Sequence, residues 1–338
     1  MNPLFNGDFL ISSDRYGETM NSVVLPFLAS REKAEKISGF EDKPLYCVSY
    51  EAENPRGTVL VLHGFTENAY KFSELIYSLL NNRFSVVSYD QRGHGRSWRA
   101  EGIRDGSVTH VDRFSDYVSD LRAVCRSVLA RFPKPWMIFA HSMGGAVATS
   151  YLEEYPETFS AAALCAPMIA PNLGGLPKAF ARTLCRTAKT FGRERNRPFF
   201  MKPYSGHEDF NTSCASDFNR FKWYDDVKAA RKEFQNSIPS YLWTFEAVNV
   251  TEKLLAAGAP EKIACPVLLF TADQDFSVLP AEQKLLISRI KKGKNIFVKG
   301  SRHEIYRSEN SVLFPWWHMT LSFLSNPESL DDLSLPSS

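Results

Sequence analysis

Ser142 stands in the hexapeptide AHSMGG (residues 140–145), between a short apolar run that ends at Phe139 and an alanine-rich stretch. A serine flanked by small residues at a strand-to-helix turn is typical of a nucleophile elbow, whose strained backbone lifts the hydroxyl out of the sheet. Such a turn needs very small side chains two positions before and two positions after the serine. Ala140 and Gly144 occupy these positions. We therefore predict that Ser142 is a nucleophile.

A serine hydroxyl becomes a good nucleophile only when a base removes its proton and a carboxylate holds that base. In folds that use the elbow, the acid and then the histidine follow the serine along the chain. Here Asp275 follows the apolar run 267–270, and His303 follows the run 295–298. We predict that Asp275 is the acid, with Asp273 as an alternative. His303 is then the base, because an imidazole with a pKa near ~6.5 can accept and return a proton at neutral pH.

The oxyanion of the tetrahedral intermediate needs two backbone N–H donors. One donor comes from the residue after the nucleophile and the other from a loop after an early strand. Met143 follows Ser142, and the predicted strand 58–62 runs directly into His-Gly-Phe. We predict that the N–H groups of Phe65 and Met143 form the oxyanion hole. The other histidines near these motifs do not follow a late strand, and we expect them to hold loops in place: His63, His94 and His141.

The elements that must position these residues are short apolar runs alternating with helix-length segments. The runs expected to be buried strands are 58–62, 84–89, 136–139, 161–165, 267–270 and 295–298, and the intervening helices include 71–81, 112–132 and 280–291. Such continuous runs predict an α/β fold with a mostly parallel sheet and helices on both faces. Residues 45–51 are expected to add an antiparallel edge strand.

The alternation stops between about Pro167 and Pro266. This stretch is too long for an ordinary connection, and it predicts a mainly helical cap over the carboxyl edge of the sheet, where open α/β folds bind their ligands. The predicted organisation is an N-terminal extension (1–40), an α/β core (41–167 and 260–325), a cap or lid (168–259) and a flexible tail (326–338).

The composition is that of an ordinary globular protein, with 44% hydrophobic and 23% charged residues among 338. The net charge of +2 predicts no general attraction to nucleic acid. The six cysteines show neither a C-x-x-C pair nor metal-ligand spacing, so we expect reduced thiols and no metal or organic cofactor. The sequence shows no signal-peptide pattern and no apolar run near ~20 residues. We expect a cytoplasmic protein without an obligate protein partner.

Three motifs carry a family resemblance: HGFTE (63–67), DQRGHGRS (90–97) and AHSMGG (140–145). They resemble the α/β-hydrolase superfamily, and more narrowly its bacterial lysophospholipase and monoacylglycerol lipase branch. The segments VDRFSDY (111–117), APM (166–168) and SYLW (240–243) are similar to the lysophospholipase members in particular.

The resemblance covers about residues 45–325; it is strongest over 57–170 and weakest in the cap. It implies the α/β-hydrolase fold, with Ser142, Asp275 and His303 as nucleophile, acid and base. The implied activity is hydrolysis of the carboxylester of a single-chain lipid, a lysophospholipid or a monoacylglycerol.

The same catalytic residues are also compatible with other functions. A small-ester esterase needs no further residue, whereas a serine aminopeptidase needs acidic cap groups to hold the substrate ammonium. The available acids are Glu208, Asp217, Asp225 and Asp226. A non-catalytic ligand-binding homologue is a third possibility. An epoxide hydrolase or dehalogenase is disfavoured, because those enzymes use an aspartate where Ser142 stands.

The cap carries a concentration of positive charge. Residues 178–202 hold eight basic side chains and one acid, a net charge of +7, which leaves −5 for the rest of a chain whose total is +2. A helix is predicted from Pro177 to Arg197. Five basic residues recur along one face of it at spacings of three or four: Lys178, Arg182, Arg186, Lys189 and Arg193. Its opposite face is apolar: Phe180, Leu184, Ala188 and Phe191.

This basic stripe has two interpretations. It is either a solvated outer face, or a surface that meets the anionic inner face of a membrane or a phosphate headgroup. The cap aromatics between Phe199 and Trp243 could likewise line an acyl tunnel or form the core of the lid.

Overall fold

The computed structural model describes residues 4–335, and an eight-stranded sheet forms its centre. Its strands are β1 (Lys33–Ser38), β2 (Pro44–Tyr50), β3 (Thr58–Leu62), β4 (Ser85–Tyr89), β6 (Trp136–His141), β7 (Ala161–Cys165), β9 (Val267–Gln274) and β10 (Gly293–Arg302). Their order is β1-β2-β4-β3-β6-β7-β9-β10. The six strands from β4 to β10 in this order run parallel, which confirms the predicted mostly parallel sheet.

The antiparallel part of the sheet differs from the prediction in one respect. The segment expected at 45–51 is β2, and it pairs antiparallel with β4. It is not the edge strand, because β1 pairs along its other side from Lys33↔Ser49 to Ser38↔Pro44. The sequence of β1, KAEKIS, is rich in charged residues and its side chains are mostly exposed. Charged side chains are usual on edge strands, where they discourage further pairing, but they hide such a strand from a search for apolar runs.

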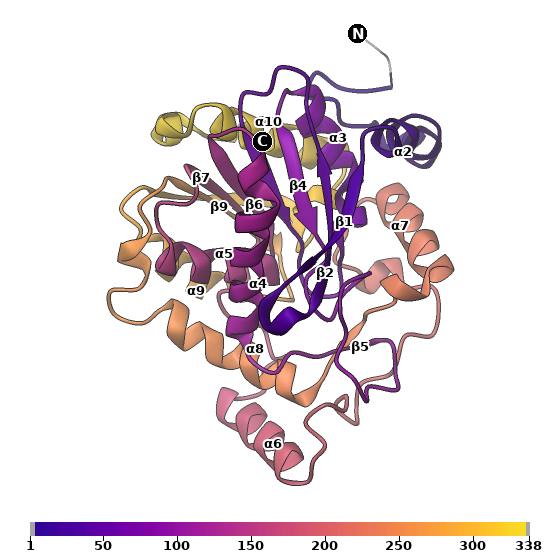
Figure 1. Cartoon of the computed structure of the whole chain (residues 1–338), viewed down its shortest axis with the longest axis vertical. Helices are drawn as coiled ribbons and strands as arrows, with labels where there is room; N and C mark the ends of the chain where they lie inside the picture. The colour runs from indigo at the N-terminus through magenta and orange to yellow at the C-terminus, as the bar shows by residue number, and fades with distance from the viewer. Residues whose placement is uncertain (1–3, 336–338) are drawn as a thin grey trace.

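Helices cover both faces of the sheet (Figure 1). The α-helices outside the cap are α1 (Tyr16–Thr19), α2 (Leu25–Ala29), α3 (Ser73–Asn81), α4 (Phe114–Ser127), α5 (Met143–Glu154), α9 (Pro280–Ile287) and α10 (Asn310–Ser325), of which α1 and α2 pack on other helices. Successive side chains of a strand point to opposite faces. Accordingly, Val59 and Val61 of β3 join one buried cluster with α3 and α10, and Leu60 and Leu62 join another with α4 and α5.

The cap lies between β7 and β9 in the chain. It contains α6 (Lys178–Thr190), α7 (Phe218–Ala230), the short strand β8 (Ile238–Pro239) and α8 (Tyr241–Leu254). β8 pairs with β5 (Val108–Thr109), and α8 packs on the core through Trp243, Ala247 and Val250. The helix α8 therefore lies between the core helices and α6, which forms one end of the molecule (Figure 1).

The predicted helix from Pro177 to Arg197 is shorter than expected. α6 ends at Thr190, and Gly192 adopts a left-handed conformation (φ 64°) that ends the helix, so Arg193 lies beyond it. The predicted apolar face is also wrong in part, because Phe180 and Phe191 are 55% and 73% exposed.

The buried face of α6 consists of Ala181, Cys185 and Ala188, of which the last two pack with Tyr241 of α8. Ala181, the first residue of this buried face, directly follows Phe180. Because each residue of an α-helix turns the chain by about 100°, the two side chains point in different directions. Small residues face the cap interior, and two phenylalanines of the cap face outward.

Candidate active site

Ser142 lies between β6 and α5 with φ 50° and ψ −118°, a conformation that is strained for a residue with a side chain. Backbone hydrogen bonds hold it in place: its N–H donates to the Cys165 carbonyl at 3.1 Å, and its carbonyl accepts from the Met168 N–H at 2.8 Å. A Cβ on Gly144 would lie 2.5 Å from the His63 carbonyl oxygen. Only glycine allows this approach, and the turn therefore has the geometry predicted for a nucleophile elbow.

The structure brings Ser142, His303 and Asp275 together at the carboxyl ends of β6, β10 and β9. The Ser142 Oγ is 2.8 Å from His303 Nε2, and His303 Nδ1 is 2.7 Å from Asp275 Oδ2. The other oxygen of Asp275 accepts hydrogen bonds from the N–H groups of Ser277 (2.8 Å) and Val278 (3.1 Å). The carboxylate is thus fixed by its own loop and oriented toward the imidazole.

The two candidate acids have different surroundings. Burial alone would raise the pKa of Asp275, but the hydrogen bond and charge of His303 and the two loop N–H groups lower it below its usual value. Asp275 is therefore ionised at neutral pH. The exposed Asp273 accepts a hydrogen bond from the Gly300 N–H at 2.9 Å and makes none to His303. Its contact is with the turn in β10.

The loop after β3 borders Ser142. A Cβ on Gly64 would lie 2.9 Å from the Ser142 Cβ, so the backbone of this loop approaches the serine closely. Within residues 4–335, the N–H groups of Phe65 and Met143 donate to no protein acceptor. The Phe65 ring packs against Trp243 of α8, with centroids 4.0 Å apart, which fixes the loop beneath the cap. Both predicted oxyanion donors thus remain available to a ligand.

A model of the family described as serine aminopeptidase, S33, matches residues 53–310. The chain belongs to this family of α/β-hydrolases. It is 29% identical over 325 residues, 90% of both chains, to the protein named lysophospholipase L2 of Escherichia coli strain K12. It is 25% identical over 273 residues, 77% of this chain and 85% of the relative, to a monoacylglycerol lipase of Mycolicibacterium smegmatis. The resemblance to this superfamily and branch is confirmed.

Solved structures show the same fold. A soluble variant of monoglyceride lipase from Saccharomyces cerevisiae superposes with a TM-score of 0.67 at 18% identity, covering 89% of this chain and 96% of that one. The monoacylglycerol lipase of Paleococcus ferrophilus superposes with a TM-score of 0.64 at 20% identity, covering 83% and 98%. The α/β-hydrolase fold of this family member is therefore shown.

The buried carboxylate of Glu67 joins the three loops of the site in this S33 protein. It accepts hydrogen bonds from the Gly64 N–H (2.5 Å), from His141 Nδ1 (2.8 Å), from Lys71 Nζ (3.0 Å) and from the hydroxyl of Tyr306. These groups belong to the loop after β3, to the short helix Ala69–Phe72, to the end of β6 before Ser142 and to the segment that follows His303. Glu67 is part of the motif HGFTE, but its role could not be predicted from the sequence, because its partners are distant in the chain.

His141 connects Glu67 to His303. Its Nε2 lies 3.2 Å from the carbonyl oxygen of His303, and its ring centroid lies 4.9 Å from the His303 ring. Burial alone would lower the pKa of His141, but the adjacent carboxylate of Glu67 outweighs burial and raises it. Both ring nitrogens face acceptors, so the imidazole can carry two protons and donate from both. His141 thus contacts Glu67 and the backbone of His303, and its expected role in holding a loop stays a prediction.

A second buried carboxylate, that of Glu304, extends this network of charged side chains. Lys71 Nζ donates to Glu304 at 2.5 Å, and Arg307 donates to the same carboxylate at 2.6 Å. Burial would raise the pKa of Glu304, but these two cations lower it to about 2. Because the pKa of Glu67 is also held well below its usual range, the network stays charged at neutral pH.

Replacing Glu67 with glutamine is expected to destabilise the fold by about 3 kcal/mol, because it leaves Lys71 and His141 buried beside a neutral amide. The loops of the site lose their common anchor, so kcat should fall more than KM rises. Urea unfolding and steady-state kinetics measure the two effects. Glu157→Gln, an exposed carboxylate on the surface, is the matched control. Unchanged unfolding and kinetics in Glu67→Gln would contradict this role.

The cap covers the site. The Glu304 N–H donates to the Cys214 carbonyl at 2.9 Å, and Arg302 donates to the carbonyls of Phe210, Ser213 and Ala215. Ser142 and His303 are only 8% and 5% exposed. Cap residues therefore pack against the segment that carries His303.

The structure separates the five residues of the predicted basic stripe. Arg182 pairs with Glu252 of α8 at 2.5 Å, and Lys178 lies 3.9 Å from Glu282. Arg186 lies over the Phe245 ring. Lys189 and Arg193 form no ion pair within the described part of the chain. The stripe is thus partly engaged with the protein itself, and its unpaired charge lies at the carboxyl end of α6.

The four cap acids considered for an aminopeptidase each face a basic side chain. The pairs are Glu208 with Lys228 (2.5 Å), Asp217 with Arg220 (3.4 Å), Asp225 with His207 (2.6 Å) and Asp226 with Lys222 (2.5 Å). Of the residues described, His207, Asp225 and Asp226 place three potential metal-ligand atoms within 4.8 Å of one another. The carboxylates of this group are already engaged with the basic side chains named above.

Proposed function

We propose that this protein is a serine carboxylester hydrolase that acts on lysophospholipids or monoacylglycerols through an acyl-enzyme. The observation that carries the proposal is the chain of hydrogen bonds from Ser142 through His303 to Asp275, beside the unengaged N–H groups of Phe65 and Met143. The names of the relatives, lysophospholipase L2 and monoacylglycerol lipase, support the class of substrate.

In this mechanism, His303 takes the proton of Ser142 as the Oγ attacks the ester carbonyl. The N–H groups of Phe65 and Met143 stabilise the resulting oxyanion, each by about 3 kcal/mol. His303 then protonates the departing glycerol-containing alcohol, which leaves the acyl group on Ser142. A water molecule, deprotonated by His303, releases the fatty acid. Asp275 holds the imidazole orientation and stabilises its protonated form throughout.

An aminopeptidase activity is less well supported, although the family carries that description. It requires an unengaged carboxylate for the substrate ammonium, and the four candidate acids of the cap already pair with basic side chains. A substrate panel tests the choice: lysophosphatidylcholine, monoacylglycerol, short nitrophenyl esters and aminoacyl anilides. We expect the highest kcat/KM for the two lipids. Preference for the anilides would overturn the proposal.

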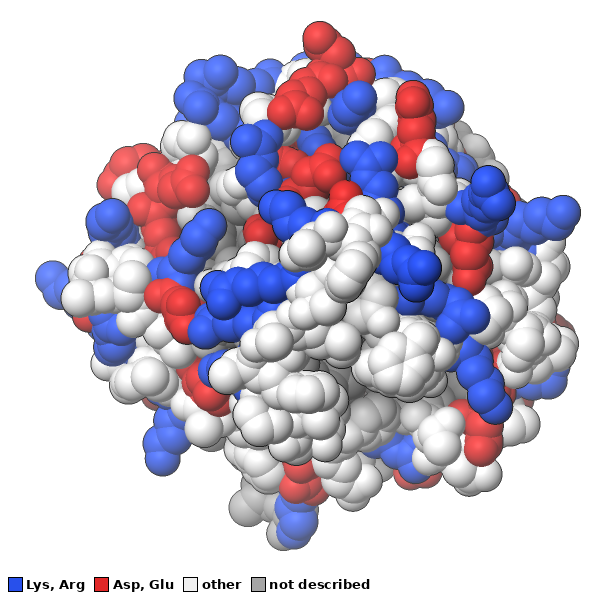
Figure 2. All heavy atoms as spheres, turned by 90° about the horizontal axis from the view of Figure 1, so that it is seen from below, with Lys and Arg blue, Asp and Glu red and all other residues white. Residues whose placement is uncertain are grey.

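We also propose that the outer surface of the cap contacts an anionic membrane. Seen from the end of the molecule at which α6 lies, Lys and Arg side chains flank a region of uncharged side chains (Figure 2). Large apolar side chains are exposed in this part of the cap: Leu176, Phe180, Phe191, Phe199 and Phe200. Apolar side chains beside unpaired basic ones suit the interface of an anionic bilayer. No helix of residues 4–335 has both the length and the apolar character needed for a membrane span.

Vesicle binding distinguishes the apolar from the basic contribution. Phe180→Ser/Phe191→Ser is expected to weaken partitioning to neutral and anionic vesicles alike. Lys189→Gln is expected to weaken binding to anionic vesicles by about fivefold at low salt, since one basic residue contributes ~1 kcal/mol. The exposed Lys36 on β1 gives the control Lys36→Gln. Equal partitioning of the wild type to neutral and anionic vesicles would contradict the contact.

A further inference from the structure

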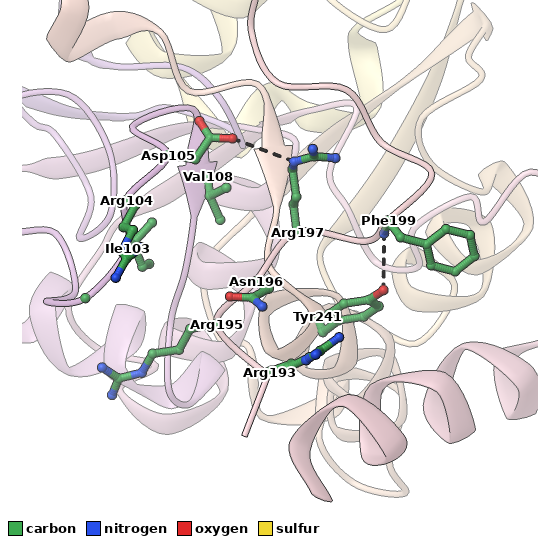
Figure 3. Close-up of a pocket in the computed structure, with 11 residues that line it drawn as sticks. Ile103, Arg104, Asp105, Val108, Arg193, Arg195, Asn196, Arg197, Phe199 and Tyr241 are labelled. Atoms are coloured by element: carbon green, nitrogen blue, oxygen red, sulfur yellow. Dashed lines mark hydrogen bonds and ion pairs between the residues drawn. The ribbon is translucent and has the colours of Figure 1, made fainter. Parts of the chain in front are cut away.

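A cationic cavity of about 600 Å³ lies between the core loop 102–108 and the cap segment 193–199. Four arginines belong to its lining: Arg104 from the loop, and Arg193, Arg195 and Arg197 from the cap (Figure 3). Asp105 is the one carboxylate in the lining. None of the proposed catalytic and oxyanion-hole residues lines the cavity, so it is not the space around Ser142.

Two of these arginines are neutralised and two are not. Asp105 lies 3.8 Å from Arg197, and Asp112, outside the lining, lies 3.6 Å from Arg195. Arg104 and Arg193 have no carboxylate within 4.0 Å among residues 4–335, and both are exposed. Glu194 is in the same segment, but it does not contribute to the lining. Two of the four arginines in the lining, one from the core and one from the cap, are therefore unpaired.

Guanidinium groups have a planar fork of donors that matches the oxygens of a phosphate. The remaining walls suit the apolar part of an amphiphile, because Ile103, Val108, Phe199 and Tyr241 also line the cavity. The hydroxyl of Tyr241 accepts a hydrogen bond from the Phe199 N–H at 3.2 Å, which joins two of these walls (Figure 3).

The first turn of α8 connects this cavity to the oxyanion loop. Ser240 caps the helix by accepting from the Trp243 N–H at 3.0 Å, and its hydroxyl contacts His110 at 2.8 Å. Tyr241 follows Ser240 in the wall of the cavity, and the Trp243 ring packs on Phe65. A group bound in the cavity therefore lies against the same helical turn that supports a proposed oxyanion donor.

We propose that this cavity binds a phosphate ester. The phosphate is either the headgroup phosphate of a single-chain phospholipid or that of a small soluble ester. The first source rests on the proposed function, in which the substrate is a lysophospholipid that carries such a phosphate. Phosphate binding itself does not depend on hydrolysis.

Binding measurements with three probes test whether the cavity binds phosphate and which class of compound supplies that phosphate. The probes are glycerol 3-phosphate, an ether analogue of lysophosphatidylglycerol that has no ester to hydrolyse, and the corresponding alkylglycerol without phosphate. Calorimetric Kd values are compared for the wild type and Arg104→Ala/Arg193→Ala. The Kd of the ether phospholipid is expected to rise about tenfold or more, as lost charge-assisted hydrogen bonds would require. The Kd of the alkylglycerol should stay within about twofold.

The exposed Arg126 on α4, which makes no ion pair in the described chain, provides the control Arg126→Ala. A matching rise for glycerol 3-phosphate would identify a site that accepts soluble phosphate esters, whereas a rise for the lipid alone would identify a headgroup site. An unchanged Kd for both phosphate probes, or an equal rise for the alkylglycerol, would overturn the proposal.

The two proposals can fail independently. If the wild type hydrolyses no ester but its phosphate binding depends on Arg104 and Arg193, the proposed function fails and the phosphate site stands. If esters are hydrolysed and phosphate binding does not depend on these arginines, the proposed phosphate site is wrong and the proposed hydrolase function is supported.

Discussion

Substitution of Ser142 by alanine is expected to lower kcat for ester hydrolysis by about 10⁶-fold, the scale of loss when a triad nucleophile is removed. The alanine keeps the strained turn but offers no atom to accept the acyl group. Catalysis by the N–H groups of Phe65 and Met143 would remain as a small residual rate. Steady-state kinetics on a lysophospholipid and on a nitrophenyl ester measure the loss. A fluorophosphonate probe should label the wild type and leave the variant unlabelled.

Three further variants test whether this loss is specific to Ser142 and His303. His303→Ala should cost nearly as much as Ser142→Ala, and the double variant should cost little more than either alone, because the two residues act as a unit. The exposed Ser160 supplies the control Ser160→Ala, which should retain labelling and activity. Equal labelling of the wild type and Ser142→Ala, or no labelling of the wild type, would favour a non-catalytic ligand-binding protein.

The contact of Ser142 with His303 was predictable because it follows from topology. Parallel strands bring their carboxyl ends to one edge of the sheet, so residues that follow separate strands meet there although they are distant in the chain. The apolar runs of β6, β9 and β10 are visible in the sequence, and the residues that follow them are therefore expected to lie near one another. The same reasoning placed Phe65 beside the serine, since it follows β3.

Features that depend on side-chain partners could not be predicted in this way. Glu67 stands in a recognisable motif, but its importance lies in contacts with His141 and Tyr306, which spacing does not reveal. The outward-facing Phe180 was assigned to a buried face because periodicity gives the faces of a helix but not the neighbour that covers one of them. The edge strand β1 was missed because its charged residues resemble those of a loop.

The second large effect on kcat is expected from replacing the acid of the triad, for which Asp275 and Asp273 are the two candidates. Asp275→Asn is expected to lower kcat by about 10⁴-fold, because an amide cannot stabilise the protonated imidazole and can favour the wrong tautomer of His303. Asp273→Asn is the matched control within the same loop. Its side-chain oxygen can still accept from the Gly300 N–H, so kcat should stay within about twofold, as for a substitution worth less than ±0.5 kcal/mol.

The pH profile separates loss of charge from loss of structure in Asp275→Asn. The pKa of Asp275 is lowered in the folded protein, so its ionised form stabilises the fold above the ordinary aspartate pKa, and this stabilisation disappears as the pH falls through the lowered value. At neutral and alkaline pH the wild-type carboxylate is fully charged, and raising the pH cannot restore a charge to asparagine. The loss in kcat should therefore persist on the alkaline side while the variant remains folded by circular dichroism. A larger loss in Asp273→Asn than in Asp275→Asn would reassign the acid.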